Sequence, residues 1–173
     1  MNKTDSWKIF KIEMIGAAFI SVLGSFLHFT FNLSNNFWVV GTFSAINEST
    51  WEHLKLAVIP SIIWMIASKI IFKIKNDNFL WAKTVSIYLA PLLIISGFYL
   101  YTAIIGSNFL IIDISLFIAS VVIAQYVSYK IMTGPRKSKI ADSVCLTLIS
   151  VLLLTFFLFS FYPPKFFLFK NPL

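Results

Sequence analysis

The residues best suited to chemistry lie in one stretch, residues 47–55, which reads Asn-Glu-Ser-Thr-Trp-Glu-His-Leu-Lys. It holds two carboxylates, an imidazole and an amine, in a chain of which only 12% is charged. If a helix extends back to residue 48, Glu48, Glu52 and Lys55 share one face by the i, i+4, i+7 rule. His53 then lies about 100° further round the helix. This pattern predicts a polar site suited to acid–base or metal chemistry.

Two ionisable residues far away in the sequence are expected at the same depth. In an alternating topology, His28 lies about one turn inside the end of the first span, and Asp113 about one turn inside the start of the fourth. Ionisable residues at membrane depth are costly and usually face the bundle interior in pairs. Histidine and carboxylate are zinc ligands, and catalytic zinc takes about three of them plus water. We therefore predict a divalent metal such as zinc on His28, His53 and either Asp113 or Glu48.

Several reaction types fit these residues. With a metal present, Glu52 is the expected general base. Without one, Glu52 polarises His53 as the base, and Glu48 is the second catalytic carboxylate. In a third scheme the carboxylates relay protons or cations, as in transporters, whose sites lie near broken helices such as one containing Pro60. The groups expected to bind a substrate are the polar side chains nearby: Asn47, Lys55 and Tyr99.

A purely structural interpretation of the same stretch competes with these schemes. Ser49 and Glu52 have the spacing of a capping box, with Ser49 at the N-cap of a helix. Carboxylates also suit the positive end of a helix dipole, and Lys55 would pair with Glu52. Trp51 is typical of the aromatic belt at a membrane surface. On this view the motif only starts and anchors a helix.

The composition of the chain determines which elements position these residues. Of 173 residues, 58% are hydrophobic, which exceeds the soluble average and excludes a cytosolic globule, a disordered tail or a disulfide-stapled secreted domain. We predict a single all-α integral membrane domain with five helices, about residues 12–33, 49–72, 79–105, 109–132 and 140–162. Residues 36–46 are too few to span a membrane and are expected to be interfacial or re-entrant.

The net charge of +7 is explained by an orientation in the membrane. Eleven of the fourteen basic residues fall on one side of five alternating helices; Lys55, Lys165 and Lys170 fall on the other. By the positive-inside rule the N-terminus is cytoplasmic and the C-terminus is outside. The basic residues therefore indicate membrane lipids as neighbours and no nucleic acid.

Small residues in the first span predict close helix packing. Ala17, Ser21 and Ser25 form a ridge at four-residue spacing, with Gly24 beside it, and such ridges let helices approach closely in lipid. If this face is exposed, it would permit a homo-oligomer.

The segment Phe43–Lys55 resembles the signature of a family of small bacterial multi-pass membrane proteins of unknown function, in which Asn-Glu-Ser-x-Trp-Glu-His-x-Lys is typical. The tail also resembles that family in Tyr162–Pro164, Leu168-Phe169 and Asn171-Pro172, although Phe167 and Asn171 replace a Pro and an Asp of its pattern. The resemblance implies a protein of the bacterial cell membrane with a shared motif at its outer face. It names no activity.

Together these observations favour a membrane-embedded hydrolase or transferase. Its site would lie at the extracytoplasmic face and act on a lipid, lipid-linked or peptide substrate. The alternatives are an ion- or small-solute-binding transporter component and a non-catalytic structural or interaction protein. The separation of His28 and His53 discriminates between them, because two zinc ligands lie within a few ångströms of each other, at bonds of about 2 Å.

Overall fold

The computed structural model describes residues 3–135 and 140–171, and in this part of the chain all regular structure is helical. The helices are α1 (Lys3–Leu33), α2 (Trp38–Gly41), α3 (Thr50–Ile71), α4 (Phe79–Ile105), α5 (Leu110–Thr133), α6 (Asp142–Phe161) and the 3-10 turn η1 (Phe167–Phe169). All but α2 and η1 are long and apolar enough to cross a membrane. The chain therefore has the fold of a helical membrane protein, as the hydropathy of its sequence predicts.

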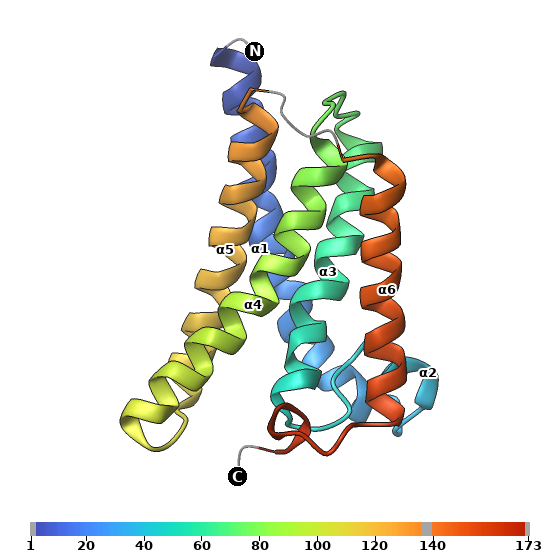
Figure 1. The fold of residues 1–173 in the computed structure, drawn as a ribbon, viewed down its shortest axis with the longest axis vertical. Helices are drawn as coiled ribbons and strands as arrows, with labels where there is room; N and C mark the ends of the chain where they lie inside the picture. Colours follow the sequence, from blue (N-terminus) through green and yellow to red (C-terminus); the bar gives the residue numbers. More distant parts are fainter. Residues whose placement is uncertain (1–2, 136–139, 172–173) are drawn as a thin grey trace.

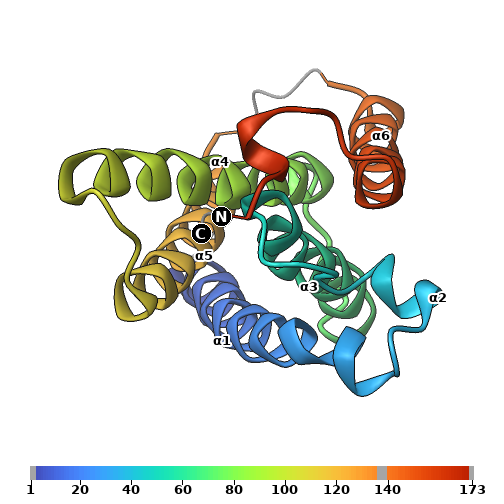
Figure 2. The same ribbon diagram turned by 90° about the horizontal axis from the view of Figure 1, so that it is seen from below.

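The five long helices form an uneven bundle. Helices α1, α3, α4 and α5 pack on one another, whereas α6 lies at the side and contacts α4. In Figure 1 the N-terminus lies at one end of the bundle, and the C-terminus lies at the other, together with α2 and the start of α3. Toward that second end, α4 and α5 lean away from the rest, so their connection lies apart from α2 (Figures 1 and 2).

The predicted spans agree with the last four long helices to within two residues at each end. The first helix differs, because it begins at Lys3, nine residues before the predicted start at residue 12. Residues 3–11 contain no proline or glycine to interrupt a helix. Contacts with α5 stabilise these added turns of α1, because the Ser6 hydroxyl bonds the Tyr129 hydroxyl and Phe10 packs on the Tyr129 ring. A helix can thus continue beyond the apolar stretch that marks its membrane span.

The segment between α1 and α3 stays at one end of the bundle. Asn35 and Asn36 have positive φ angles of 54° and 58°, a conformation that asparagine tolerates better than most residues. They end α1 and turn the chain into the single turn of α2. Ser44 then ties the segment back to α1, because its hydroxyl donates to Leu27 O at 2.6 Å and accepts from Phe31 N at 3.1 Å.

The close approach of α1 and α3 uses a different face from the predicted ridge. A Cβ atom at Gly16 would overlap the Trp64 ring, and one at Gly24 would lie 2.4 Å from Leu56 O. Ile20 between them is fully buried. Of the ridge residues, Ala17 is buried but Ser25 is exposed. Helix rotation is set by packing, so glycines one position away from the ridge make the contact.

Lys83, which sequence analysis groups with the basic loops, is a core residue. Its amine donates to both carboxylate oxygens of Glu13, at 2.6 and 2.7 Å, and lies 3.3 Å from Gln125 Oε1. All three side chains are almost fully buried and come from α4, α1 and α5. Three other basic residues assigned to that side, Arg136, Lys137 and Lys139, and Pro172 of the tail lie outside the described residues.

Candidate metal centre

The start of α3 separates the residues of the motif. Ser49 is the N-cap, its hydroxyl accepting from Glu52 N at 3.4 Å, and Asn47 Oδ1 accepts from Ser49 N at 2.9 Å. This is the helix start that the capping pattern predicts. Glu48 therefore lies before the helix. The shared helical face of Glu48, Glu52 and Lys55 required a helix that extends back to residue 48, and this condition is not met.

Glu48 instead lies between the two histidines of the chain. Its Oε2 is 3.5 Å from His53 Nε2 and 4.0 Å from His28 Nε2. The ligand atoms of the three residues all lie within 4.8 Å of one another, and the two imidazole centroids are 5.0 Å apart. His28 comes from the last turns of α1, Glu48 from the connection and His53 from the first turn of α3. We call these three residues the His-Glu-His cluster.

The backbone orients one of the imidazoles. His53 Nδ1 lies 2.9 Å from Ser49 O, so this nitrogen donates and Nε2 is the ring nitrogen that faces Glu48. Histidines that bind metals typically donate their second N–H to a carbonyl or carboxylate in this way. His28 Nδ1 is shielded from solvent and has no hydrogen-bond partner among the described residues.

These distances fit a zinc-sized ion with small adjustments. Two ligands of a tetrahedral zinc, each at about 2.0–2.1 Å, lie about 3.3 Å apart. The observed separations exceed this by less than an ångström for both pairs that involve Glu48, and all three ligand atoms lie within 4.8 Å of one another, so the histidines must also move closer together around an ion. The Glu48 side chain is 63% exposed and lies outside a helix, so it can make that shift at little cost. Two histidines and a glutamate are also a known ligand set of catalytic zinc.

Asp113, predicted as a further metal ligand, lies elsewhere. Its carboxylate accepts hydrogen bonds from Tyr101 Oη and from Asn108 Nδ2 and so closes the α4–α5 connection. It does not belong to the His-Glu-His cluster. Depth along the helix places it at the same end as His28, but α4 and α5 lean away there (Figure 1). Of the two carboxylates considered for the metal, Glu48 is the one beside the histidines.

Glu52 and Lys55 belong to a separate, buried network. Their side chains form an ion pair, and both are nearly inaccessible to solvent. Lys55 Nζ also donates to Gly41 O at 2.8 Å and to Ser160 Oγ at 2.9 Å, and Ser160 Oγ donates to Glu52 Oε1 at 2.7 Å. Ile46 N donates to Glu52 Oε2 at 2.9 Å. The network thus joins α3 to the α2 segment and to the end of α6.

The remaining predicted site residues lie at the edge of this region. Asn47 is exposed and makes the turn before the N-cap. The Tyr99 hydroxyl lies 3.2 Å from Thr50 Oγ1, and its ring packs on Phe167 of η1. Phe169 of η1 packs on Trp51. The C-terminal aromatic tail therefore covers the first turn of α3 on the side of Tyr99.

Two buried polar groupings have partners that sequence reasoning missed. Ser160 carries no distinguishing pattern, so its role with Glu52 and Lys55 has no sequence signal. Glu13 offers one, because a carboxylate at membrane depth requires a partner. Lys83 is that partner, although its position near the α3–α4 connection suggests a loop charge.

The fold and this site define a helical membrane protein with a candidate metal centre between two of its helices. The chain belongs to a family: the model described as "Family of unknown function (DUF6512)" matches residues 1–173. No curated protein and no solved structure matches the chain significantly.

Proposed function

We propose that this protein binds a divalent metal ion such as zinc with His28, Glu48 and His53, and that the bound metal serves a hydrolase or transferase reaction. The observation that carries the proposal is the convergence of both histidines of the chain on one carboxylate, within 4.8 Å, from three separate segments. The chain has few histidines, and a purely structural helix start does not require them to lie together. Their proximity therefore favours a metal site over a simple helix cap.

The ligand set supports catalysis over a purely structural metal. Structural zinc sites are usually closed by four protein ligands, whereas catalytic sites have three and an open position. The cluster supplies three, and Glu48 is exposed. A metal bound there would lower the pKa of a coordinated water and polarise a carbonyl or phosphoryl oxygen. Candidate substrates are lipids, lipid-linked molecules or peptides that reach this end of the bundle.

The chain's own residues would hold and orient these groups. Ser49 O fixes the tautomer of His53, and the N-cap holds this turn at the start of α3. Glu52 is the predicted base, but its carboxylate faces Lys55, Ser160 and the backbone of Ile46. We therefore assign Glu52 to positioning of the α2 segment and not to proton transfer.

The location of the centre follows from the charge distribution. Most basic residues lie toward the N-terminal end of the bundle, which the positive-inside rule places in the cytoplasm. The His-Glu-His cluster lies at the opposite end and would face the extracytoplasmic side. We further propose, from the resemblance of its motif, that this is a bacterial cell membrane. A cysteine-accessibility experiment on Lys8→Cys and Lys165→Cys in intact cells tests this orientation.

Metal analysis of the purified, detergent-solubilised protein tests the proposal. We expect about one zinc per chain after dialysis against zinc and a washing step, and strong loss of zinc in His28→Ala and Glu48→Gln. Asp113→Asn is the matched control, since it removes a carboxylate charge at the same end without touching the cluster. Equal zinc content in all four proteins, or no zinc in any, would contradict the proposal. If zinc binds but no substrate analogue changes its affinity, the metal would serve only to hold α1 and α3 together.

A further inference from the structure

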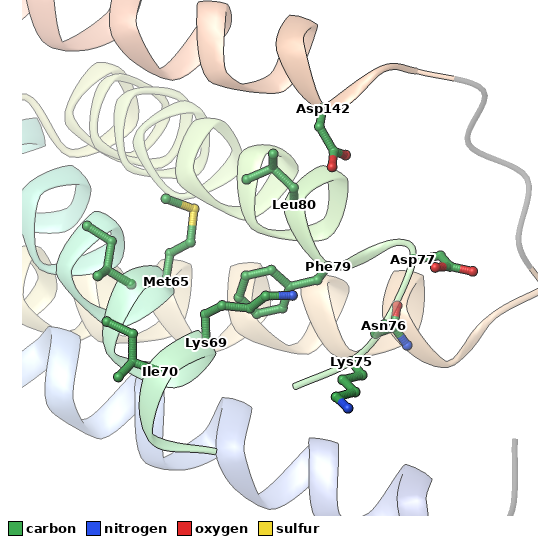
Figure 3. A pocket seen from close by; sticks show the side chains of 10 residues that line it. Met65, Lys69, Ile70, Lys75, Asn76, Asp77, Phe79, Leu80 and Asp142 are labelled. Carbon is green, nitrogen blue, oxygen red and sulfur yellow. The ribbon is translucent and has the colours of Figure 1, made fainter. Parts of the chain in front are cut away.

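A pocket of about 700 Å³ lies at the end of the bundle opposite the His-Glu-His cluster. It is formed by the last turns of α3, the connection to α4, the first residues of α4 and the first residue of α6. Its volume falls in the range typical of ligand sites, about 300–1,000 Å³. Figure 3 shows its lining side chains, which come from segments up to 77 positions apart, from Met65 to Asp142.

The lining of this pocket changes character along the helix axis. Met65 and Ile66 line it within the body of α3, while the ionisable side chains lie at the helix ends and in the connection, beside the apolar Ile70, Phe79 and Leu80. Those ends mark the level of the membrane surface for helices that span it. An apolar wall on the body of α3 with charged groups beyond it suits a phospholipid, whose acyl chain is apolar and whose headgroup is charged.

The charged groups of the pocket include both signs. Lys69 and Lys75 supply amines, and Asp77 and Asp142 supply carboxylates. Lys69 Nζ donates to Ile74 O at 2.9 Å and lies 4.8 Å from the centroid of the Phe79 ring. An ammonium has three donors, and among the described residues one of them is used in this bond, so others are available to a phosphate.

We propose that this pocket binds a phospholipid whose headgroup carries both a phosphate and a primary ammonium, the phosphatidylethanolamine class. Lys69 would donate to the phosphate, and Asp142 would accept from the ammonium. A purely anionic headgroup would place a negative charge where the Asp142 carboxylate meets the ammonium in the proposed complex. A quaternary ammonium has no N–H to donate to Asp142. The site is independent of the metal centre, which lies at the other end of the bundle.

Native mass spectrometry of the full-length protein tests the proposal. The protein is released from micelles that contain equal amounts of phosphatidylethanolamine, phosphatidylglycerol and phosphatidylcholine of identical acyl chains. We expect one phosphatidylethanolamine to be retained preferentially, and its retention to fall about tenfold in Lys69→Gln, the change expected when one charged hydrogen bond is lost. Asp142→Asn is expected to abolish the preference over phosphatidylglycerol while retaining a lipid.

Lys11→Gln is the matched control, because Lys11 is also exposed and lies 5.3 Å from the centroid of an aromatic ring, that of Trp7, but outside the pocket. Its lipid retention should equal that of the unmodified protein. Equal retention of the three lipids would overturn the proposal, as would preference for phosphatidylglycerol or equal losses in Lys69→Gln and Lys11→Gln. Thermal unfolding of each variant in detergent separates loss of lipid from loss of fold, and Asp142→Asn tests the site without altering α3.

Discussion

The motif at residues 47–55 has two parts that differ in burial and in hydrogen bonding. Glu48 and His53 lie in the His-Glu-His cluster, where Glu48 is 63% exposed and its partners are 3.5 and 4.0 Å away. Glu52 and Lys55 are buried, paired with each other, and satisfied by Ser160, Gly41 and Ile46. Both parts contain a carboxylate and a nitrogen base, but only the first has the open coordination that a ligand needs.

The difference shows how burial changes the role of the same functional groups. A buried ion pair must be fully hydrogen-bonded, because the desolvation of two charges is costly. Once so satisfied, its oxygens and protons are no longer free for substrate. An exposed carboxylate between two imidazoles has little of this cost and keeps its lone pairs available. Within this motif, therefore, the contrast in burial supports the proposal of metal chemistry at the exposed half, while the buried half joins α3 to α6 and to the α2 segment.

The largest expected effect comes from removing one charge of the buried pair. Lys55→Met keeps the length of the side chain but leaves Glu52 buried without its cation, at a cost of about 3–5 kcal/mol in the free energy of unfolding. Thermal unfolding in detergent measures this loss. The double variant Lys55→Met, Glu52→Gln should recover part of it. A Lys55→Met protein as stable as the unmodified one would show that the pair does not hold the fold.

Removing a residue of the His-Glu-His cluster should have the opposite effects: a small loss of stability and a large loss of zinc binding. His53→Ala should change the stability of the metal-free protein by less than about 1 kcal/mol, because the side chain is partly exposed. It should remove the zinc-induced stabilisation, about 2.7 kcal/mol at a zinc concentration 100 times the Kd. A zinc titration followed by thermal unfolding measures both. Full zinc stabilisation of His53→Ala would exclude His53 as a ligand.

A smaller effect is expected from the hydroxyl that links α6 to the pair. Ser160→Ala leaves one acceptor oxygen of Glu52 and one donor of Lys55 without this partner, which costs about 1–3 kcal/mol. Zinc binding should stay unchanged, since Ser160 does not contact the cluster. Limited proteolysis of the tail after Phe161, together with thermal unfolding, would detect the looser α6. A loss of zinc affinity instead would show that the two halves of the motif are coupled.

The smallest expected effect comes from the N-cap, which the two halves share. Ser49→Ala removes the side-chain bond to Glu52 N and should cost about 1 kcal/mol of stability. His53 Nδ1 bonds the backbone oxygen of residue 49, which the substitution retains, so zinc affinity should change by less than about twofold. Isothermal titration with zinc compares the two proteins. A large fall in zinc affinity would mean that the cap, and not the backbone oxygen, orients His53.

The sequence predicts some of these features for clear physical reasons and not others. Apolar runs of membrane length mark α3 to α6 closely, because lipid accepts few polar residues in a span. Hydropathy predicts the depth of Asp113 in the membrane but not its position in the membrane plane. That position depends on helix tilt, which is set by packing that hydropathy does not encode. Whether Glu48 and Glu52 belong to the same site depends on the residue at which α3 begins. The capping pattern predicts a start at Ser49, which leaves Glu48 outside the helix, whereas a start at residue 48 would place Glu48 on the face of Glu52.

The pair of Glu13 and Lys83 has a consequence for the synthesis of the protein. A lysine without a counter-charge inside a transmembrane helix makes insertion of that helix costly, and Lys83 lies in the second turn of α4. Glu13 precedes Lys83 by 70 residues, so α1 is made well before α4 leaves the ribosome. A nascent α4 can therefore meet its counter-charge as it enters the bilayer. The order of the chain therefore provides the counter-charge of Lys83 before α4 is inserted.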